Sequence, residues 1–232
     1  MFKTFFNPGS FEKLASKLNL PILILSCVSM ITGLIIIFYF SPDDYQQGST
    51  VKIMYIHVPA AYISLMTFAI MAIYSIISLA FKMPFGFIIN KALAPIGAVF
   101  TLICIVSGSL WGKPMWGTWW VWDARLTSVF ILFITYILVI LIRQSFTNIE
   151  IGEKISAVFV ILGSINLPII KFSVDWWNTL HQPASISKLS SPSIDITMLI
   201  PLLIMTVAFM SITLNIALIS IRYEIINRKR QI

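Results

Sequence analysis

Charged residues are scarce in this chain: Asp, Glu, Lys and Arg make up only 11% of its 232 residues, whereas a soluble domain carries about 25%. Apolar residues account for 58%, and the mean hydropathy is +0.92. So little charge excludes a soluble globular domain, whose surface has to be covered by polar side chains. We therefore predict a polytopic integral membrane protein of the all-α class, because helices satisfy their own backbone hydrogen bonds within lipid.

Cysteine is also scarce. The two cysteines, Cys27 and Cys104, lie in separate apolar stretches, and neither belongs to a Cys-x-x-Cys or Cys-x-x-Cys-His motif. This excludes a thiol oxidoreductase and a covalent haem carrier of the usual cytochrome c type. The sequence also lacks a phosphate-binding loop, a nucleophile–base pair and a metal-ligand cluster, so we expect neither an ATPase nor an enzyme of another kind. We expect no cleavable signal, because the first long apolar run is a full span.

Six stretches of the chain are free of charge and long enough, or nearly so, to cross a membrane. A spanning helix needs roughly 20 apolar residues, with about 17 as the minimum. The fifth stretch is the shortest, and we extend it to residue 172. The loops between the stretches are short, so we expect one six-span membrane domain over residues 1–232 and no separate soluble domain. The predicted spans are 20–40, 53–81, 92–110, 126–142, 155–172 and 196–221.

Lysine and arginine are distributed unevenly between the two sides of these spans. With the N-terminus inside, eleven of the 16 lie on the inner side and five on the outer side, as the positive-inside rule expects. Both termini are therefore predicted to be cytoplasmic in a bacterial inner membrane, or on the matrix side if the membrane is mitochondrial. The net charge of +7 follows from this bias and from a basic C-terminus that contacts anionic lipid, so no nucleic-acid partner is expected. The outer five are Lys52, Lys113, Arg125, Lys171 and Lys188.

Tryptophan is abundant on the predicted outer side. Of the three outer loops, at about 41–56, 111–125 and 171–195, the second and third contain all seven tryptophans. An aromatic belt would place tryptophan at both membrane interfaces, yet the predicted inner side has none. We interpret the two clusters as a platform for a large, flat, apolar ligand, with an ordinary belt as the open alternative. The seven are Trp111, Trp116, Trp119, Trp120, Trp122, Trp176 and Trp177.

The two histidines, His57 and His181, lie beside these clusters on the same predicted side. A haem iron accepts two neutral imidazoles at its axial positions, and its macrocycle stacks on flat apolar rings. His57 precedes Pro59 by two residues and so suits the first turn of a helix. There the positive end of the helix dipole favours the neutral ring that ligation requires. The alternative, two hydrogen-bonded structural histidines, stays open.

Polar residues in and near the tryptophan-rich loop have both a structural and a functional interpretation. Asp123 either caps the fourth span or takes part in the site, whereas Asp195 is expected only to cap the sixth. Arg125 is the preferred contact for a carboxylate such as a haem propionate, because a guanidinium binds carboxylates bidentately. Lys52 and Lys113 are the other nearby cations, and any of the three has an ordinary solvated role as its alternative.

Pro114 suits the start of a short helix, whereas Gly112 and Gly117 suggest turns or close approach to a flat ligand. If 114–123 is helical, helical spacing divides its large residues between two faces. The shared face is the one that contacts a flat ligand, although a helix lying on the bilayer has the same pattern. Trp116, Trp119, Trp120 and Asp123 share this face, and Trp122 is turned elsewhere.

The run WGKPMWGTWWVWDARLT at 111–127 resembles the tryptophan-rich WWD signature of the haem-handling proteins of cytochrome c biogenesis. MYIHVPAA at 54–61 and WWNTLHQP at 176–183 resemble the two histidine segments of one family among them, the haem exporter protein C (CcmC) family. The length and the six predicted spans also match that family, and the resemblance covers nearly the whole chain.

This resemblance implies a site for transiently bound haem b with two histidine ligands at the iron. His57 and His181 are the implied axial ligands, and Arg125 is the implied propionate contact. Lys52 stands where we expected Arg, which leaves a second propionate contact open. The implied haem-binding residues are His57, His181, Trp111, Trp116, Trp119, Trp120, Trp122, Asp123 and Arg125.

The resemblance also implies a function and partners. Such proteins present haem on the outer face of the membrane to a membrane-anchored haem chaperone, CcmE. They work beside the ABC transporter subunits CcmA and CcmB and a small single-span subunit, CcmD. Two other functions remain as alternatives: an electron-transferring b-type membrane cytochrome, whose histidines usually lie deep in the bilayer, and a transporter of another solute, which usually has interrupted helices or polar groups at the midplane.

Overall fold

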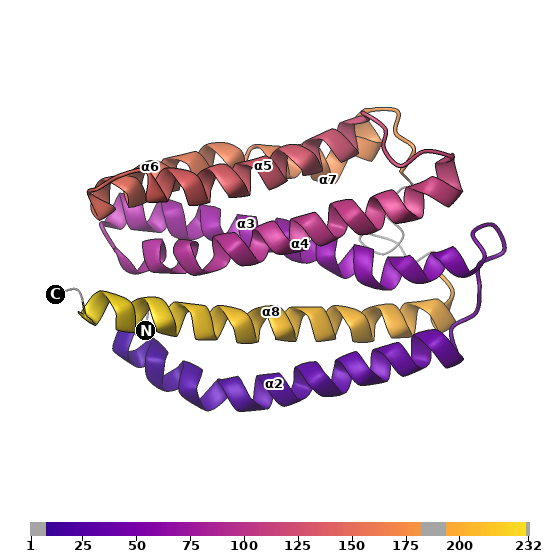
Figure 1. The fold of residues 1–232 in the computed structure, drawn as a ribbon, viewed down its shortest axis with the longest axis horizontal. Helices are drawn as coiled ribbons and strands as arrows, with labels where there is room; N and C mark the ends of the chain where they lie inside the picture. Colours follow the sequence, from indigo (N-terminus) through magenta and orange to yellow (C-terminus); the bar gives the residue numbers. More distant parts are fainter. Residues whose placement is uncertain (1–7, 182–193, 231–232) are drawn as a thin grey trace.

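The computed structural model describes residues 8–181 and 194–230, and throughout these ranges it is built from long helices (Figure 1). Its elements are α2 (Pro8–Tyr39), the 3-10 helix η1 (Ser49–Ile53), α3 (Met54–Phe81), α4 (Phe85–Trp116), α5 (Ala124–Gln144), α6 (Ile149–Gly163), α7 (Asn166–Trp176) and α8 (Ile196–Arg230). Within the described residues, six helical stretches are long and apolar enough to cross a membrane, with α6 and α7 counting together as one. The prediction of an all-α protein with six spans is therefore confirmed.

The helices extend beyond the charge-free stretches from which the spans were predicted. α2 begins at Pro8 rather than near residue 20, and α8 continues to Arg230 rather than ending near 221. Long Lys and Arg side chains can reach the headgroup layer from the last turns of a membrane helix. A helix therefore does not have to end where its apolar stretch ends.

A short helix over 114–123, which Pro114 suggested, does not form. α4 continues through Pro114 to Trp116, and Gly117 follows in the left-handed conformation with a φ of 75°. The N–H of Gly117 donates to the carbonyl oxygen of Lys113 at 3.1 Å and closes the last turn. Glycine ends helices in this way because it has no Cβ to clash at positive φ. Residues 117–123 instead form an irregular connection to α5.

The fifth span is broken rather than continuous over 155–172. α6 ends at Gly163, and α7 begins at Asn166. Pro168 is the third residue of α7, and in a first turn its missing N–H costs no helical hydrogen bond. Pro168 cannot donate a hydrogen bond to the carbonyl of residue 164 and so favours the break at this point, although other prolines, such as Pro95 in α4, lie within continuous helices.

The helices form a bundle in which segments distant in sequence meet at one end. In Figure 1 α2 lies beside α8, α3 and α4 occupy the middle, and α5, α6 and α7 lie on the side away from α2. The connections 40–48 and 117–123 and residues 177–181 gather at one end, which we call the tryptophan end. The predicted outer loops therefore share an end, apart from residues 182–193, including Lys188, which lie outside the described residues. Which side of the membrane this end faces stays a prediction.

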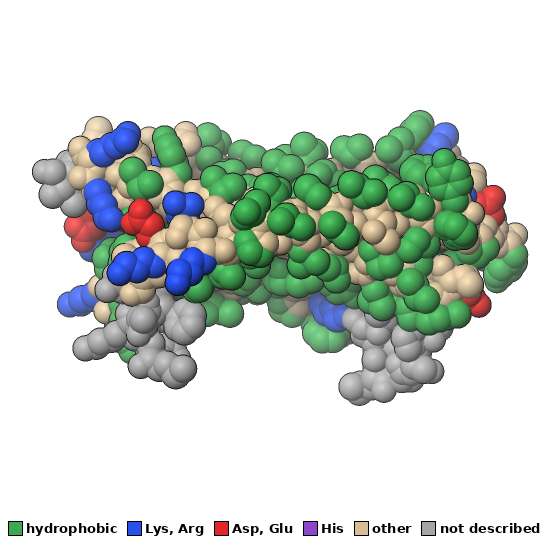
Figure 2. All heavy atoms as spheres, turned by 90° about the horizontal axis from the view of Figure 1, so that it is seen from below, with side chains coloured by type: hydrophobic (Ala, Val, Ile, Leu, Met, Phe, Trp, Pro, Cys, Tyr) green, Lys and Arg blue, Asp and Glu red, His purple; other side chains and the backbone are tan. Residues whose placement is uncertain are grey.

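The opposite end is rich in cations. Figure 2 shows Lys and Arg side chains gathered there and apolar side chains over the middle of the molecule. Arg143 of α5 and Arg228 of α8 both pair with Glu153 of α6, whose carboxylate is buried. Arg143 also donates from Nη1 to the carbonyl oxygen of Phe87 in α4 at 2.8 Å. A buried carboxylate and two guanidinium groups thus join four helices far from the tryptophan end.

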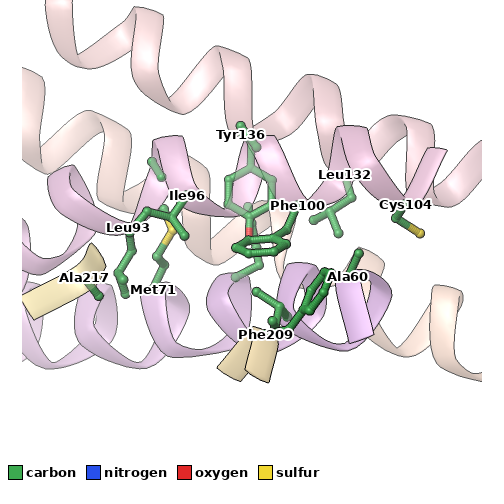
Figure 3. Close-up of a cluster of buried hydrophobic side chains, with 14 of the residues drawn as sticks. Ala60, Met71, Leu93, Ile96, Phe100, Cys104, Leu132, Tyr136, Phe209 and Ala217 are labelled. Atoms are coloured by element: carbon green, nitrogen blue, oxygen red, sulfur yellow. The ribbon is translucent and has the colours of Figure 1, made fainter. Parts of the chain in front are cut away.

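The middle of the bundle is packed around Tyr136, which reaches from α5 among side chains of α3 and α4 (Figure 3). Its hydroxyl donates to the carbonyl oxygen of Ser64 at 2.7 Å, and its ring meets Phe68 edge-on at 4.9 Å between centroids. A Cβ at Gly97 would lie 2.2 Å from Cζ of Tyr136. The ring fits only because Gly97 has no side chain, so three helices depend on this contact.

We expect Gly97→Leu to lower the thermal unfolding midpoint of the detergent-solubilised protein. The new side chain has to displace the Tyr136 ring, and overpacking of this kind costs about 1–3 kcal/mol. Val99→Leu is the matched control, because Val99 lies two residues away in α4 and is exposed on the surface of the bundle. Equal midpoints for the two variants would contradict this account of the packing.

Candidate functional site

A cavity of about 760 Å³ lies at the tryptophan end among α3, α4, α7 and α8. Its volume falls within the range of about 300–1,000 Å³ that is typical of ligand and cofactor sites. Both histidines of the chain line it, together with Arg125. A smaller hollow of about 110 Å³ shares these three residues and continues toward α5, where Trp120 lines it. Segments more than a hundred residues apart in sequence therefore contribute to one site.

His57 lies in the first turn of α3, as predicted, and α4 fixes the orientation of its ring. Nδ1 is 3.0 Å from the carbonyl oxygen of Cys104 and 3.1 Å from Oγ of Ser107. A carbonyl oxygen can only accept, so Nδ1 carries the hydrogen, and in the neutral ring Nε2 keeps its lone pair. Metal-ligating histidines are oriented by this kind of second contact. His57 is thus prepared to offer Nε2 to a metal.

Two further residues of α4 confine the His57 ring. A Cβ at Gly108 would lie 2.9 Å from Cε1 of His57, so the close approach of the two helices depends on this glycine. The indole of Trp111 meets the ring edge-on, with 5.8 Å between centroids and 75° between planes. Sequence reasoning found Trp111 but missed Cys104, Ser107 and Gly108. The signal was their spacing, since 104, 107, 108 and 111 recur at three and four residues and share one helix face.

His181 follows α7, and its ring makes fewer hydrogen bonds to the described residues than the ring of His57. Its ring lies 5.1 Å from that of Trp116, between centroids. Nδ1 is buried without a hydrogen-bond partner among the described residues, and Oδ2 of Asp123 is 3.9 Å from it. Burial lowers the pKa of His181 from 6.5 to about 4, and the nearby Arg125 guanidinium acts in the same direction. The ring is therefore neutral at pH 7, as ligation of a metal requires.

Asp123 and Arg125 connect α5 to the segment that carries His181. Oδ1 of Asp123 accepts from the N–H of Leu126 at 2.7 Å and caps α5, which confirms the structural interpretation of this residue. Its Oδ2 accepts from the N–H of Leu180 at 3.4 Å, so the same carboxylate also reaches the neighbour of His181. Arg125 donates from Nε to Oγ of Ser173 in α7 at 2.9 Å. Arg125 is thus held beside the cavity that it lines.

The tryptophans of the loop are divided between the cavity and the surface. Trp111 and Trp116 line the main cavity, and Trp116 and Trp120 line the smaller hollow. Trp119 and Trp122 line neither within the described residues and are 55% and 72% exposed. The predicted shared face of Trp116, Trp119 and Trp120 does not form, because the helix ends at Gly117 before the last two. That Trp119 and Trp122 contact a ligand stays a prediction.

The remaining predicted residues also have defined positions. Lys52 pairs with Asp43 at 3.1 Å, and Nζ of Lys113 donates to the carbonyl oxygen of Gly117 at 3.0 Å. Neither lysine lines the main cavity within the described residues, whereas Lys171 does. Asp195 caps α8 as expected, since its carboxylate accepts from the N–H of Thr197 at 2.8 Å. Arg125 and Lys171 are thus the cations that the described part of the chain places at the cavity wall.

Trp176 and Trp177 lie outside both cavities. They are exposed at the end of α7 and form an aromatic cluster with Phe172, whose ring stacks on that of Trp176 at 5.4 Å between centroids. Indoles exposed at the end of a membrane-spanning helix suit the lipid–water interface. The second tryptophan cluster therefore does not form part of the cavity wall, unlike three indoles of the first.

Comparison with known proteins identifies relatives along most of the chain. The family described as "Heme exporter protein C" matches residues 1–232. "Heme exporter protein C" of Bradyrhizobium diazoefficiens is 46% identical over 223 residues, which cover 96% of this chain and 84% of that protein. The Escherichia coli K12 protein of the same name is 45% identical, covering 86% of this chain and 80% of its own. A Marchantia polymorpha protein named "Putative cytochrome c biosynthesis ccmC-like mitochondrial protein" is 49% identical, covering 75% and 74% respectively.

We expect the protein to lose stability as the pH falls from about 6.5 toward 4, in part because of His181. The unfolded chain takes up the proton near pH 6.5, whereas the folded protein takes it up only near 4. Between these values, lowering the pH therefore favours the unfolded state. Unfolding midpoints from pH 8 to 4.5 should decrease more steeply for the native chain than for His181→Gln. Both proteins keep His57, so its contribution cancels, and parallel curves would show that His181 is not buried as a neutral ring.

Proposed function

This chain belongs to the heme exporter protein C family, and from that membership we propose that it binds haem at the tryptophan end and presents it there during cytochrome c biogenesis. One observation carries the proposal: the two histidines of the chain line one cavity of about 760 Å³. Because the two histidines are more than a hundred residues apart in sequence, it is the fold that brings them to one cavity. It is the arrangement expected of a pair of axial ligands to one haem.

The cavity fits haem in size and in chemistry. When bound, haem supplies an iron that accepts two axial ligands, a flat apolar macrocycle and two propionate carboxylates. The structure offers two neutral imidazoles, the indoles of Trp111 and Trp116, and the guanidinium of Arg125 at the cavity wall. Each chemical feature of haem thus has a counterpart in this cavity.

In the proposed function, different residues ligate the iron, bind a propionate and orient the ligands. His57 offers Nε2, because its Nδ1–H is engaged by the carbonyl oxygen of Cys104. Arg125 provides the charge that attracts a propionate, and its bond to Ser173 holds it in place. Asp123 orients His181 once Nδ1 and Oδ2, now 3.9 Å apart, come within hydrogen-bond distance. A carboxylate behind a ligating imidazole both fixes the ring and strengthens it as a ligand.

We further propose that the tryptophan end faces the outer, periplasmic side of a bacterial inner membrane, with both termini in the cytoplasm. The gathering of Lys and Arg at the opposite end supports this orientation (Figure 2). The exposed indoles of Trp119 and Trp122 give the haem chaperone CcmE an apolar surface on which to dock beside the cavity. CcmA, CcmB and CcmD complete the proposed set of partners.

We propose that haem reaches the site sideways from the bilayer. The cavity follows α3 inward from His57 past Ala61 to Leu65, which at 1.5 Å per residue is about 12 Å along the helix. Tyr62 lines the cavity and is also 43% exposed on the surface of the bundle. A side chain that contacts both the cavity and the lipid marks the lateral boundary between them.

The two alternative functions lack comparable support. A b-type electron-transfer cytochrome holds its haem between histidines deep in the bilayer, whereas His57 and His181 both lie at the tryptophan end. The break between α6 and α7 is an interruption of the kind found in transporters, but a transporter of another solute also calls for a polar binding site at mid-depth. In the described residues the middle of the bundle is packed with apolar side chains around Tyr136 (Figure 3).

We expect His57→Ala and His181→Ala each to abolish the low-spin absorption spectrum of a bis-histidine haem in the purified protein. Each substitution removes one axial ligand while leaving the walls of the cavity. Added imidazole should restore the spectrum in both, because it can occupy the vacated position. Trp177→Phe is a control outside the cavity and should keep the spectrum. An unchanged spectrum in both histidine variants would refute the ligand assignment, and Met115, which also lines the cavity, would be the next thioether candidate.

Gly108→Val should weaken haem binding at least as strongly as loss of a ligand, although residue 108 itself carries no ligand. Its Cβ would lie 2.9 Å from Cε1 of His57, so the imidazole has to leave its position. Val106→Ile, on the exposed side of the same helix, is the matched control. Haem titrations followed at the Soret band measure the effect. Equal affinity in the two variants would mean that the His57 ring is not held against α4.

A further inference from the structure

The connection between α2 and η1 is an ordered turn that reaches the cavity. The N–H groups of Gln46 and Gln47 donate to Oδ1 of Asp44 at 2.9 and 2.8 Å. Asp44 and Gly48 form a bridge through backbone hydrogen bonds, and Gly48 has a φ of 57° that suits glycine. The carbonyl oxygen of Gln47 accepts from Oγ1 of Thr50 at 2.6 Å. The backbone of Gln47 is therefore held on both sides.

The side chain of Gln47 makes one specific contact with α4. The Nε1–H of Trp111 donates to its Oε1 at 2.8 Å, across 64 positions of sequence. Indole nitrogen can only donate, so this partner determines which end of the Gln47 amide faces Trp111. Gln47, Trp111 and His57 all line the main cavity. The contact thus lies within the site and not on the outer surface of the bundle.

This hydrogen bond acts on His57 through Trp111. The indole meets the His57 ring edge-on at 5.8 Å between centroids, on the helix that also accepts the Nδ1–H of His57. An indole without a partner for Nε1 is free to rotate about its side-chain bonds toward another acceptor. Its edge-on contact with the imidazole is then lost. A turn of the first connection thereby determines how firmly the proposed axial ligand is held.

We propose that Gln47 is a positioning residue of the haem site, which fixes the indole of Trp111 by accepting its Nε1–H and through that indole the imidazole of His57. This inference rests on the proposed haem-binding function. The connection between α2 and η1 then contributes to the affinity for haem, as the tryptophan-rich loop and the two histidine segments do. Gln47 itself donates no ligand to the iron.

The test is a double-mutant cycle in the full-length, detergent-solubilised protein, titrated with ferric haem. Gln47→Leu has similar volume and no acceptor, so it should weaken haem binding about 3- to 10-fold, the value of one neutral hydrogen bond. Its low-spin ferric electron paramagnetic resonance signal should broaden, because the His57 ring samples more orientations. Trp111→Phe should have a similar effect, and adding Gln47→Leu to it should change nothing further. Gln46→Leu, at the exposed neighbouring position, is the matched control.

Several outcomes would overturn the inference and leave the proposed function intact. One is that the wild-type protein binds haem and the Gln47→Leu variant binds it as Gln46→Leu does. Another is a full additional loss from Gln47→Leu in the Trp111→Phe background, because Gln47 would then act independently of the indole. A wild-type protein that binds no haem would instead refute the proposed function. If Gln47→Leu does not fold, Gln47→Asn replaces it, since its shorter amide stops short of Nε1 and should give the same loss.

Discussion

The hydrogen bond from Nδ1 of His57 to the backbone carbonyl of Cys104 is the interaction on which the site depends. It joins α3 to α4 at the tryptophan end and determines which nitrogen of the imidazole carries the hydrogen. A side-chain acceptor could be lost by a single substitution, whereas a backbone carbonyl cannot. The chain thus fixes the tautomer of its proposed ligand with an acceptor that does not vary with side-chain chemistry.

α4 is accordingly the main scaffold of the site. Its face at 104, 107, 108 and 111 holds His57, and Trp116 at its end contacts the ring of His181. Gly117 then ends the helix and turns the chain toward α5, whose cap Asp123 lies beside His181. One helix and the turn that follows it therefore position both imidazoles. This explains why the histidines can lie so far apart in sequence and still meet at one cavity.

The sequence predicted the parts of this arrangement that follow from local patterns. Charge-free stretches located the six spans, and a helix cap was one of the two roles predicted for Asp123, because caps depend on neighbouring residues. The position of Trp119 could not be predicted in the same way, since it depends on whether Pro114 or Gly117 determines the local fold. The helix ends at Gly117, and the indole of Trp119 lines neither cavity within the described residues.

Other features required knowledge of which helices meet. Cys104, Ser107 and Gly108 lie in an apolar stretch, where their spacing places them on one helix face with Trp111 but does not show that this face meets a histidine. They acquire that role only because α3 packs against α4. Likewise, Gln47 lies in a polar turn, and its proposed role depends on the hydrogen bond from an indole 64 positions away. Long-range pairing of this kind is invisible to patterns read along a single chain.

The two imidazoles are held unequally within the described part of the chain, which bears on the proposed release of haem. His57 is fixed by a backbone hydrogen bond, by a glycine that admits it and by an indole. His181 belongs to an irregular segment after a helix of only eleven residues, and its Nδ1 has no hydrogen-bond partner within the described part of the chain. Among the described residues, moving His181 therefore breaks fewer hydrogen bonds than moving His57. For the proposed function, α3 and α4 are accordingly the firmer side of the site.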